Sequence, residues 1–385
     1  MARARAAVVA LLVLGGCTGT LSVGNGGDAG YDSGVWLLPD DDGGTPPGTD
    51  AGTPPPGTDA GTLPGTDAGP PPMTDAGPPP GPCDGVTCMA NARCEPTTGS
   101  CVCEPGFTRM ADTCVALPPG DPAGRTRDEV CAAWNMGRME RAATPWVAGP
   151  TMCDPGRMDP EAIDDTLRRV SMYRWLAGLG PVNHDSSRHS ELMECAHMMS
   201  VNNRLSHSPG TDWTCYTAGG AAAAGRSNIA LGYRTPGSAI EGYMADRNTP
   251  SLGHRRWILG ERLTAVEIGF AGRGQCLGVF GGGGTSERAW TAYPNQGFAP
   301  IETAQNTWSF HVNHFSLGSA SATVVRVSDG AELPVSSYLT GGGGPPPTVG
   351  FTPMGWTPAV GETYRVTITG TSRGDIVYET TLVGC

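Results

Sequence analysis

Cysteine placement constrains the fold of this chain more than any other feature of its sequence. Of 13 cysteines in 385 residues, six fall within residues 83–114, separated by four, five, six, one and ten residues. Because this segment is too short to enclose much of an apolar core, disulfide cross-links must supply its stability. The total is odd, although exported domains usually pair their thiols. One cysteine therefore has another use.

That cysteine is Cys17, at the end of an N-terminal export signal. Arg3 and Arg5 precede an apolar run over residues 6–14, which is too short to cross roughly 30 Å of hydrocarbon. The small residues before Cys17 resemble a bacterial lipobox, which implies that residues 1–16 are a lipoprotein signal peptide and that the Cys17 thiol is acylated. An ordinary secretory peptide cut near this point is the alternative.

Residues 17–82 have too few large apolar side chains to form a core. The unit Thr-Asp-Ala-Gly recurs between Pro-rich spacers, at Thr49, Thr58, Thr66 and Thr74. Proline favours extended polyproline II, glycine loosens it, and the regularly placed aspartates repel one another. The segment is predicted to be a disordered, semi-extended stalk, with a contour length approaching ~200 Å at ~3 Å per residue. It lifts the folded domains away from the lipid anchor.

The cysteine spacing within residues 83–114 resembles an EGF-like module. Spacing alone allows 15 pairings, so the connectivity is what the resemblance implies. Zinc ligation is the alternative, which the exported context and the single close Cys-x-Cys pair disfavour. Prolines replace the acidic residues that precede the first cysteine in calcium-binding relatives, so no calcium site is expected. A protein-contact role and a spacer role both stay open. The implied pairs are Cys83 with Cys94, Cys88 with Cys101, and Cys103 with Cys114.

After a connecting segment at residues 115–154, the composition becomes globular. Apolar residues at helical spacing follow Asp159-Pro160, a dipeptide that favours a helix start. Shorter apolar runs bounded by glycine predict strands. The predicted helices cover residues 159–178, 187–203 and 238–247, and the predicted strands cover residues 265–271, 276–280 and 288–293.

Four motifs then occur in a fixed order. They are Leu205-Ser206-His207, Asn228-Ile229-Ala230, Gly253-His254-Arg255-x-x-Ile258-Leu259, and Glu267-Ile268-Gly269-Phe270. This order, with helices between the motifs, resembles the CAP superfamily of cysteine-rich secretory, antigen five and plant pathogenesis-related proteins. The resemblance spans residues 163–293. It implies an α-β-α sandwich with an open cleft, which we place at residues 155–295.

The resemblance also implies which side chains meet in that cleft. His207 and His254 take the two histidine positions, Asp246 takes one acidic position, and Ser227 replaces the other acid. Two imidazoles and a carboxylate suit Zn²⁺, although three protein ligands fall short of a tight structural site. The alternative is that both histidines form hydrogen bonds to the backbone or to Asp246 and hold the surrounding loops. A Ser-His-Asp arrangement using Ser227 is disfavoured, because Ser227 does not lie in a Gly-x-Ser-x-Gly motif.

The other histidines are not expected to act in the cleft. His184, His189 and His197 lie in or near the second predicted helix, where hydrogen-bonded or solvated roles are expected. His311 and His314 lie three residues apart on a predicted strand and therefore face opposite sides.

Residues 296–385 are predicted to form an Ig-like β-sandwich. Alternating segments at residues 308–315, 322–327, 364–369 and 376–383 are separated by turns rich in glycine and proline. The six cysteines outside Cys17 and the EGF-like module allow three further bridges. Proximity in sequence favours Cys131 with Cys153 and Cys195 with Cys215, which leaves Cys276 with Cys385.

The chain is therefore predicted to be an α+β protein on the outer membrane or surface of a bacterium. Its formal net charge of -12 disfavours nucleic acid as a partner. The membrane is contacted through the lipid anchor. We expect non-catalytic binding of a hydrophobic small molecule, as sterol and fatty-acid binding in relatives suggests, or of a protein or cell-envelope partner. The alternative is a peptidase- or esterase-like hydrolase, with or without metal assistance, that uses the cleft of His207, His254 and Asp246.

Overall fold

The computed structural model describes residues 81–89, 92–94, 99–103, 107–110, 113–116, 120–342 and 344–385. The predicted signal peptide, Cys17 and the stalk as far as residue 80 lie outside these ranges. Within them, no helix combines the length and the apolar character that crossing a membrane requires.

Two small hairpins form the cysteine-dense module. Strand β1 (Ala92–Cys94) pairs with β2 (Cys101–Cys103), and β3 (Phe107–Met110) pairs with β4 (Thr113–Ala116). Disulfides join Cys83 to Cys94 and Cys88 to Cys101, which are the first two pairs that the EGF resemblance implies. Cys114 is disulfide-bonded, but the side chain of Cys103 lies outside the described residues, so the pair Cys103–Cys114 stays a prediction.

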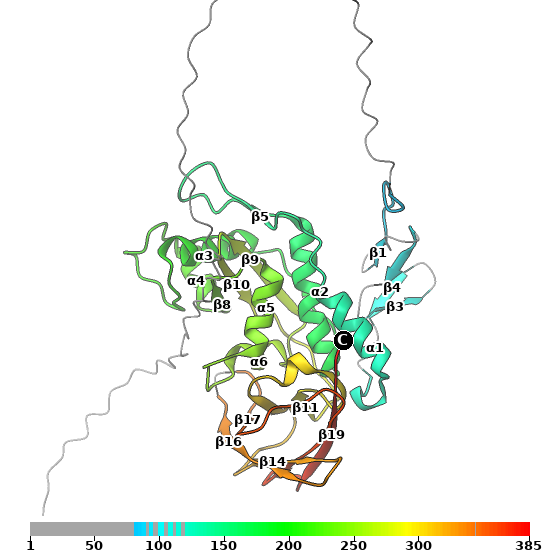
Figure 1. Ribbon diagram of the computed structural model, residues 1–385. Helices are drawn as coiled ribbons and strands as arrows, with labels where there is room; N and C mark the ends of the chain where they lie inside the picture. Colours follow the sequence, from blue (N-terminus) through cyan, green and yellow to red (C-terminus); the bar gives the residue numbers. More distant parts are fainter. Residues whose placement is uncertain are drawn as a thin grey trace, which may run out of the picture. The chain divides into compact units, whose positions relative to one another are not determined.

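A four-stranded sheet lies at the centre of the larger domain (Figure 1), in the order β7-β9-β10-β8. All its neighbouring strands are antiparallel except the parallel pair β7 and β9. The strands are β7 (Asn183–His184), β8 (Ser227–Leu231), β9 (Ala265–Ala271) and β10 (Gly274–Gly278). The helices are α1 (Arg127–Gly137), α2 (Pro160–Leu176), α3 (His189–Asn202), α4 (Ala218–Ala224), α5 (Pro236–Ala245) and α6 (Gly253–Ile258). A short 3-10 turn, η1 (Pro122–Gly124), and a two-stranded ribbon of β5 (Trp146–Val147) and β6 (Arg157–Met158) complete the domain.

Helices cover both faces of this sheet. The Cys276 side chain of β10 is bonded to Cys195 on α3, whereas its neighbour Gln275 donates from Nε2 to the Pro236 carbonyl at the start of α5, at 3.0 Å. Successive strand side chains point to opposite faces, so α3 and α5 lie on opposite sides of the sheet. Helix α4 packs with α3, and α2 packs with α5. The domain is therefore a helix-sheet-helix sandwich.

The segment at residues 115–154, predicted to be a connection, is part of this domain. It contains α1, whose Val130 and Trp134 are buried in the main core. The carboxylate of Asp165 on α2 accepts hydrogen bonds from the backbone N–H groups of Arg141, at 2.7 Å, and Ala142, at 3.1 Å. The predicted boundary was wrong here because the sequence pattern of a helix as short as α1 does not show which domain the helix packs against.

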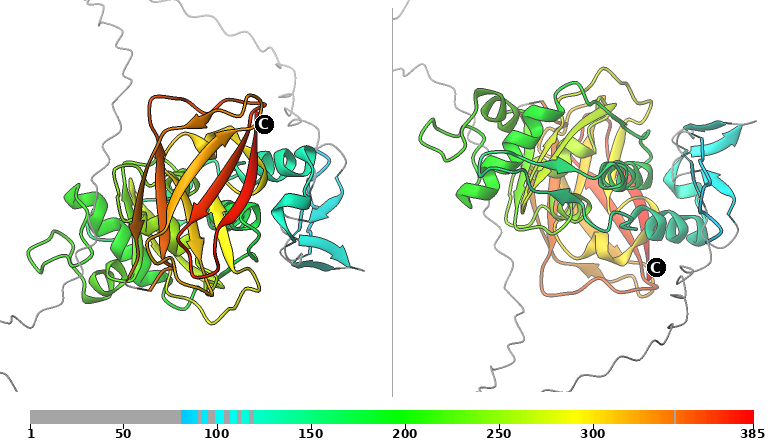
Figure 2. Two further views of the ribbon diagram at one scale, coloured as in Figure 1. Left: turned by 90° about the horizontal axis from the view of Figure 1, so that it is seen from below. Right: turned by 90° about the horizontal axis from the view of Figure 1, so that it is seen from above.

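Two sheets enclose the C-terminal core, which is built around Trp308, Phe310 and Phe351. Figure 2 shows their strands, mainly in orange and red, side by side. One sheet has the order β11-β13-β17-β16 and the other β12-β19-β18-β14-β15. The first contains β11 (Trp290–Tyr293), β13 (Trp308–Val312), β16 (Val335–Thr340) and β17 (Thr348–Pro353). The second contains β12 (Gly297–Pro300), β14 (Ser321–Arg326), β15 (Glu332–Leu333), β18 (Thr363–Thr369) and β19 (Ile376–Val383), and a 3-10 turn, η2 (Ile301–Ala304), follows β12.

The boundary between the two domains lies earlier than residue 296. Strand β11 pairs with β13 in the C-terminal region, with Trp290 opposite Val312 and Tyr293 opposite Ser309. Its residues were assigned to the CAP-like domain because an isolated strand pattern does not reveal which sheet it joins. The Ig-like classification of the two sheets remains a prediction.

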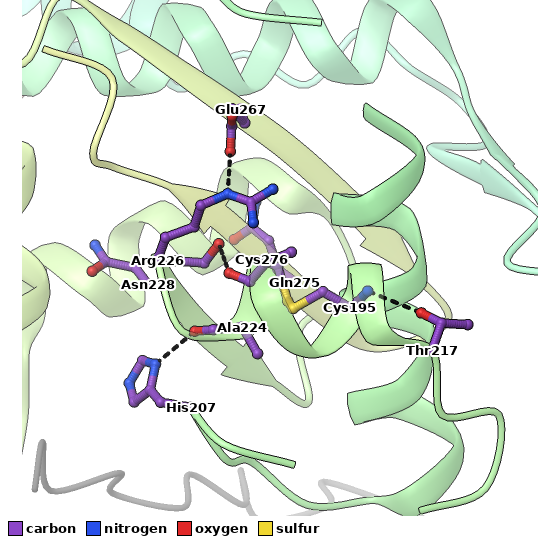
Figure 3. Close-up of a disulfide and its surroundings, with 12 residues drawn as sticks. Cys195, His207, Thr217, Ala224, Arg226, Asn228, Glu267, Gln275 and Cys276 are labelled. Carbon is purple, nitrogen blue, oxygen red and sulfur yellow. Dashed lines mark hydrogen bonds and ion pairs between the residues drawn. A yellow bond between two sulfur atoms is a disulfide. The ribbon is translucent and has the colours of Figure 1, made fainter. Parts of the chain in front are cut away.

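The three remaining disulfides differ from the pairing that proximity in sequence favoured. The predicted pairs Cys131–Cys153, Cys195–Cys215 and Cys276–Cys385 were wrong. Closing a longer loop costs little additional entropy, so spatial packing outweighs sequence separation. Figure 3 shows one result, the bridge that joins α3 to β10. The observed pairs are Cys131–Cys385, Cys153–Cys215 and Cys195–Cys276.

Two buried arginines of α6 hold the CAP-like domain against the β-sandwich. Arg255 donates from Nη1 to the Thr307 carbonyl, at 2.7 Å, and to Ser309 Oγ, at 2.9 Å. Arg256 donates to the carbonyls of Pro345, at 3.1 Å, and Pro346, at 3.0 Å. The helix is thus attached to the β-sandwich by donors that remain charged at any physiological pH.

His311 makes this junction sensitive to acid. Its fully buried ring is hydrogen-bonded to Ser309 Oγ, at 2.9 Å, and to Thr348 Oγ1, at 2.7 Å. Burial holds the pKa of His311 well below its ordinary value of 6.5, and the charges of Arg255 and Arg256 lower it further. The unfolded chain therefore binds a proton below pH 6.5 that the folded chain does not accept.

We expect the free energy of unfolding to be highest above pH 6.5 and to fall as the pH drops from 6.5 towards the lowered pKa of His311. The slope for one such histidine approaches about 1.4 kcal/mol per pH unit. Urea unfolding at pH 7.5, 6.0 and 5.0 measures it. The variant His311→Asn removes this contribution and should show a smaller pH dependence. Equal slopes for the variant and the wild type would contradict the assignment.

Candidate functional site

A small cleft opens where α6 faces the start of β8. Its volume is about 30 Å³, which has room for one or two water molecules. The cleft contains both histidines that the CAP resemblance placed together. It is lined by His207, Gly225, Ser227, Asn228, Thr249, Ser251, Gly253, His254, Trp257 and Phe280.

Asp246 and His254 form a hydrogen-bonded pair at this cleft. Helix α5 ends at Ala245. The next residue, Asp246, adopts a left-handed conformation with φ of 45° and so turns its buried carboxylate towards α6. The Nδ1 atom of His254 donates to Asp246 Oδ1 at 2.8 Å, and the Arg255 N–H donates to Oδ2 at 3.2 Å. Because Nδ1 is used in the bond to Asp246, Nε2 is the ring nitrogen of His254 that remains for other partners.

Tyr243 and Asn228 hold His254 from other directions. The Tyr243 ring stacks on the imidazole, with centroids 5.2 Å apart and planes 23° apart. Its hydroxyl donates to the Asn228 carbonyl at 2.9 Å, and Asn228 Nδ2 donates to the His254 carbonyl at 3.0 Å. Sequence reasoning did not assign roles to these two residues, although Asn228 belongs to one of the four ordered motifs. The ring of His254 is therefore held in one orientation.

His207 contributes the second imidazole and is oriented by α4. Its Nδ1 donates to the carbonyl of Ala224 at the C-terminus of that helix, at 2.9 Å (Figure 3). Burial lowers the pKa of His207 below 6.5, the bond to Ala224 opposes this shift, and the nearby His254 adds to it. His207 is therefore a neutral ring at pH 7.

Ser227 is placed as a structural residue. It is buried at the start of β8, and its hydroxyl donates to the Ala223 carbonyl of α4 at 2.8 Å. A serine hydroxyl has a single proton, so this bond prevents it from donating to His207 or His254 at the same time. The arrangement differs from that of an activated serine nucleophile.

The donor set does not fit a tight zinc site. Both carboxylate oxygens of Asp246 already accept hydrogen bonds, one of them from the His254 ring, as in a carboxylate that orients a histidine. In the part of the chain that the structure describes, no group of three or more His, Cys, Asp or Glu side chains is able to hold a metal ion. The predicted ligands His207 and His254 leave at least two positions of a tetrahedral shell without protein ligands.

The remaining histidines do not line the cleft. His189 contacts the Ile268 carbonyl through Nδ1, at 3.1 Å, and His197 contacts the Met152 carbonyl through Nε2, at 2.8 Å. The ring of His184 lies 6.2 Å from that of His189, centroid to centroid. His311 is buried in β13, whereas the partly exposed His314 follows that strand and lies 3.2 Å from the Glu261 carboxylate.

Comparison with known proteins identifies the class of this domain. The family model of the cysteine-rich secretory protein family, CAP, matches residues 167–280, so the chain contains a CAP domain. One solved structure, an extracellular protein containing an SCP domain from Bacillus anthracis str. Ames, is 18% identical, with a TM-score of 0.25. The match covers 32% of this chain and 43% of that one, less than half of its length. No curated protein matches.

Proposed function

We propose that this protein is a surface-tethered, extracytoplasmic CAP-domain lipoprotein that binds a hydrophobic small molecule and leaves it chemically unchanged. The observation that carries the proposal is an aromatic pair at the cleft. The Phe280 side chain is 55% exposed and packs on Trp257, with ring centroids 4.5 Å apart. An aromatic ring left in water beside a cleft is a surface on which an apolar ligand gains contact area.

The cleft also lacks a serine placed for nucleophilic catalysis. Ser227, the serine considered for that role, donates its proton to Ala223 instead of to a histidine. The hydrogen bond between Asp246 and His254 is consistent with a purely structural role, in which it fixes the wall of the cleft, as well as with a catalytic one. These features favour binding by the CAP domain over acyl transfer.

The extracytoplasmic location is supported by the cysteines. Five disulfides are present in the described part of the chain. Such bonds persist in oxidising compartments and are rare in the cytosol. A lipidated Cys17 followed by the stalk would hold the CAP domain near, but not against, the outer membrane or cell surface. An EGF-like module between them would act as a spacer or as a contact for a protein or cell-envelope partner.

Ligand extraction combined with an activity screen tests this function. Full-length protein purified from membranes with detergent is extracted with organic solvent, and the extract is analysed by mass spectrometry against a membrane protein purified in the same way. We expect an apolar molecule enriched near one equivalent, together with inactivity towards general peptidase and esterase substrates. A clean extract accompanied by substrate turnover would contradict the proposal.

A hydrolase is the second candidate, and one observation favours it. His254, oriented by Asp246, lines a cleft with room for one or two waters, as a general base that activates water requires. Turnover in the same screen that falls at least about 100-fold in His254→Ala, while the fold is retained, would establish this activity. Turnover unaffected by this substitution would assign the signal to a contaminant.

A further inference from the structure

A second and larger cavity lies beside the histidine cleft, between the CAP domain and the β-sandwich region. Its volume is about 540 Å³, whereas the cleft holds about 30 Å³. Small-molecule sites usually enclose roughly 300–1,000 Å³, so the larger cavity has the size of a ligand site and the cleft does not. Its apolar lining comes from Trp257, Leu263, Val279 and Phe280 of the CAP domain and from Val312, Pro345, Pro346 and Pro347 of the β-sandwich region.

The aromatic pair of Trp257 and Phe280 belongs to the linings of both cavities. The exposed area of Phe280 is therefore available to a molecule in the larger cavity. Pro345–Pro347 also line this cavity, and Arg256 holds them in place by donating to the carbonyls of Pro345 and Pro346. The two domains thus present rigid apolar groups to one volume, which suits a ligand with an apolar body.

Two charged residues, Glu261 and Arg262, also line this cavity. The Glu261 carboxylate accepts from the Ser286 N–H at 3.3 Å and lies 3.2 Å from His314 Nε2, so it already has partners. The Arg262 side chain is exposed and has no hydrogen-bond or ion-pair partner among the residues that the structure describes. Its main-chain carbonyl accepts from the N–H groups of Gly283 and Gly284, which fixes the backbone that carries it. Arg262 is therefore a cation available to an anionic group.

We propose that the larger cavity is the ligand site of this protein, and that its ligand is a small molecule with an apolar body and one acidic group. The apolar body lies against Phe280, Trp257 and the prolines, and the acidic group pairs with Arg262. This inference rests on the proposed function, because it names the place and the chemical class of the binding already inferred.

Two fluorescent probes test the site and the charge separately. The anionic probe is 1-anilinonaphthalene-8-sulfonate, and the uncharged probe is Nile red. Phe280→Ala should lower the affinity for both probes about tenfold, because it removes an aromatic side chain that both probes contact. Arg262→Gln should weaken the anionic probe about three- to fivefold and leave Nile red within about twofold. The matched control is Met354→Ala, since Met354 is an apolar side chain of similar exposure, 53%, that does not line the cavity. It should change neither affinity.

Three outcomes would contradict parts of the proposal. If Phe280→Ala leaves both probes within about twofold of wild type, the larger cavity is not the site. If Arg262→Gln weakens both probes equally, or neither, the acidic group is wrong. In both cases the proposed binding function stands when an apolar molecule co-purifies with the protein. Wild-type protein that binds neither probe and carries no apolar molecule would overturn the site and the function together.

Discussion

Removal of Cys17, the residue that we propose is acylated, is expected to release this protein almost completely from the membrane. Two or three acyl chains contribute about 0.8 kcal/mol per buried methylene, which makes anchoring by a lipidated Cys17 close to permanent. In the part of the chain that the structure describes, no helix is long and apolar enough to span a membrane. Without the acyl chains, the acidic chain, with a net charge of -12, has no attraction to anionic lipid.

The variant must also lack the natural leader. Without cleavage, the apolar residues 6–14 would stay attached and would themselves hold the chain at the membrane. Residues 1–16 are therefore exchanged for a secretory leader with an Ala-x-Ala cleavage site, and Cys17→Ser is introduced. The matched control keeps the natural leader and carries Thr18→Ser. Detergent phase partitioning should place the control in the detergent phase and the variant in the aqueous phase. An intact mass of the control that lacks a diacylglyceryl adduct at Cys17 would refute the lipid anchor.

Loss of the Arg255 guanidinium is expected to destabilise the protein by about 3–5 kcal/mol. This fully buried side chain donates to the carbonyls of Met244, at 2.7 Å, Ala245, at 3.1 Å, and Thr307, at 2.7 Å. It also lies over the Tyr293 ring, 4.3 Å from its centroid. Arg255→Met fills part of the volume but leaves these buried carbonyls without a donor, and each lost bond costs about 1–3 kcal/mol.

Chemical unfolding measures the effect, with Arg234→Met as the matched control. Arg234 is exposed, and its side chain makes no hydrogen bond, ion pair or ring contact among the described residues, so the control should stay within about 0.5 kcal/mol of wild type. Arg255→Lys should remain destabilised, because one ammonium group does not reach the same three carbonyls. If Arg255→Met costs less than about 1 kcal/mol, α6 does not depend on this arginine for its attachment to the β-sandwich.

Much of the local structure was predictable from short patterns. The helix predicted after Asp159-Pro160 is α2, and Asp159 caps it by accepting from the Glu161 N–H at 2.8 Å. The alternating segments of the C-terminal region became β13, β14, β18 and β19. Patterns of this kind depend on interactions between residues a few positions apart, which the sequence displays directly.

The site was predictable as a set of residues but not as an arrangement. The ordered CAP motifs pointed to His207, His254 and Asp246, and the structure brings the two histidines into one cleft. The sequence did not indicate that both oxygens of Asp246 are used by the chain itself, or that Ser227 donates to Ala223. Such bonds depend on side-chain directions, which backbone conformations such as the left-handed Asp246 determine.

By itself, the sequence indicated the features that are contiguous along the chain. It contains a cysteine-dense module and a CAP domain recognised by ordered motifs, and it predicts an export signal ending at Cys17 and a stalk without a core. The tertiary structure decided which cysteines pair, where β11 belongs, and that a cavity of about 540 Å³ opens between two domains. The physical reason is that these features join residues far apart in sequence. Loop closure costs nearly the same entropy for many alternative pairings, so the packing of buried side chains selects among them.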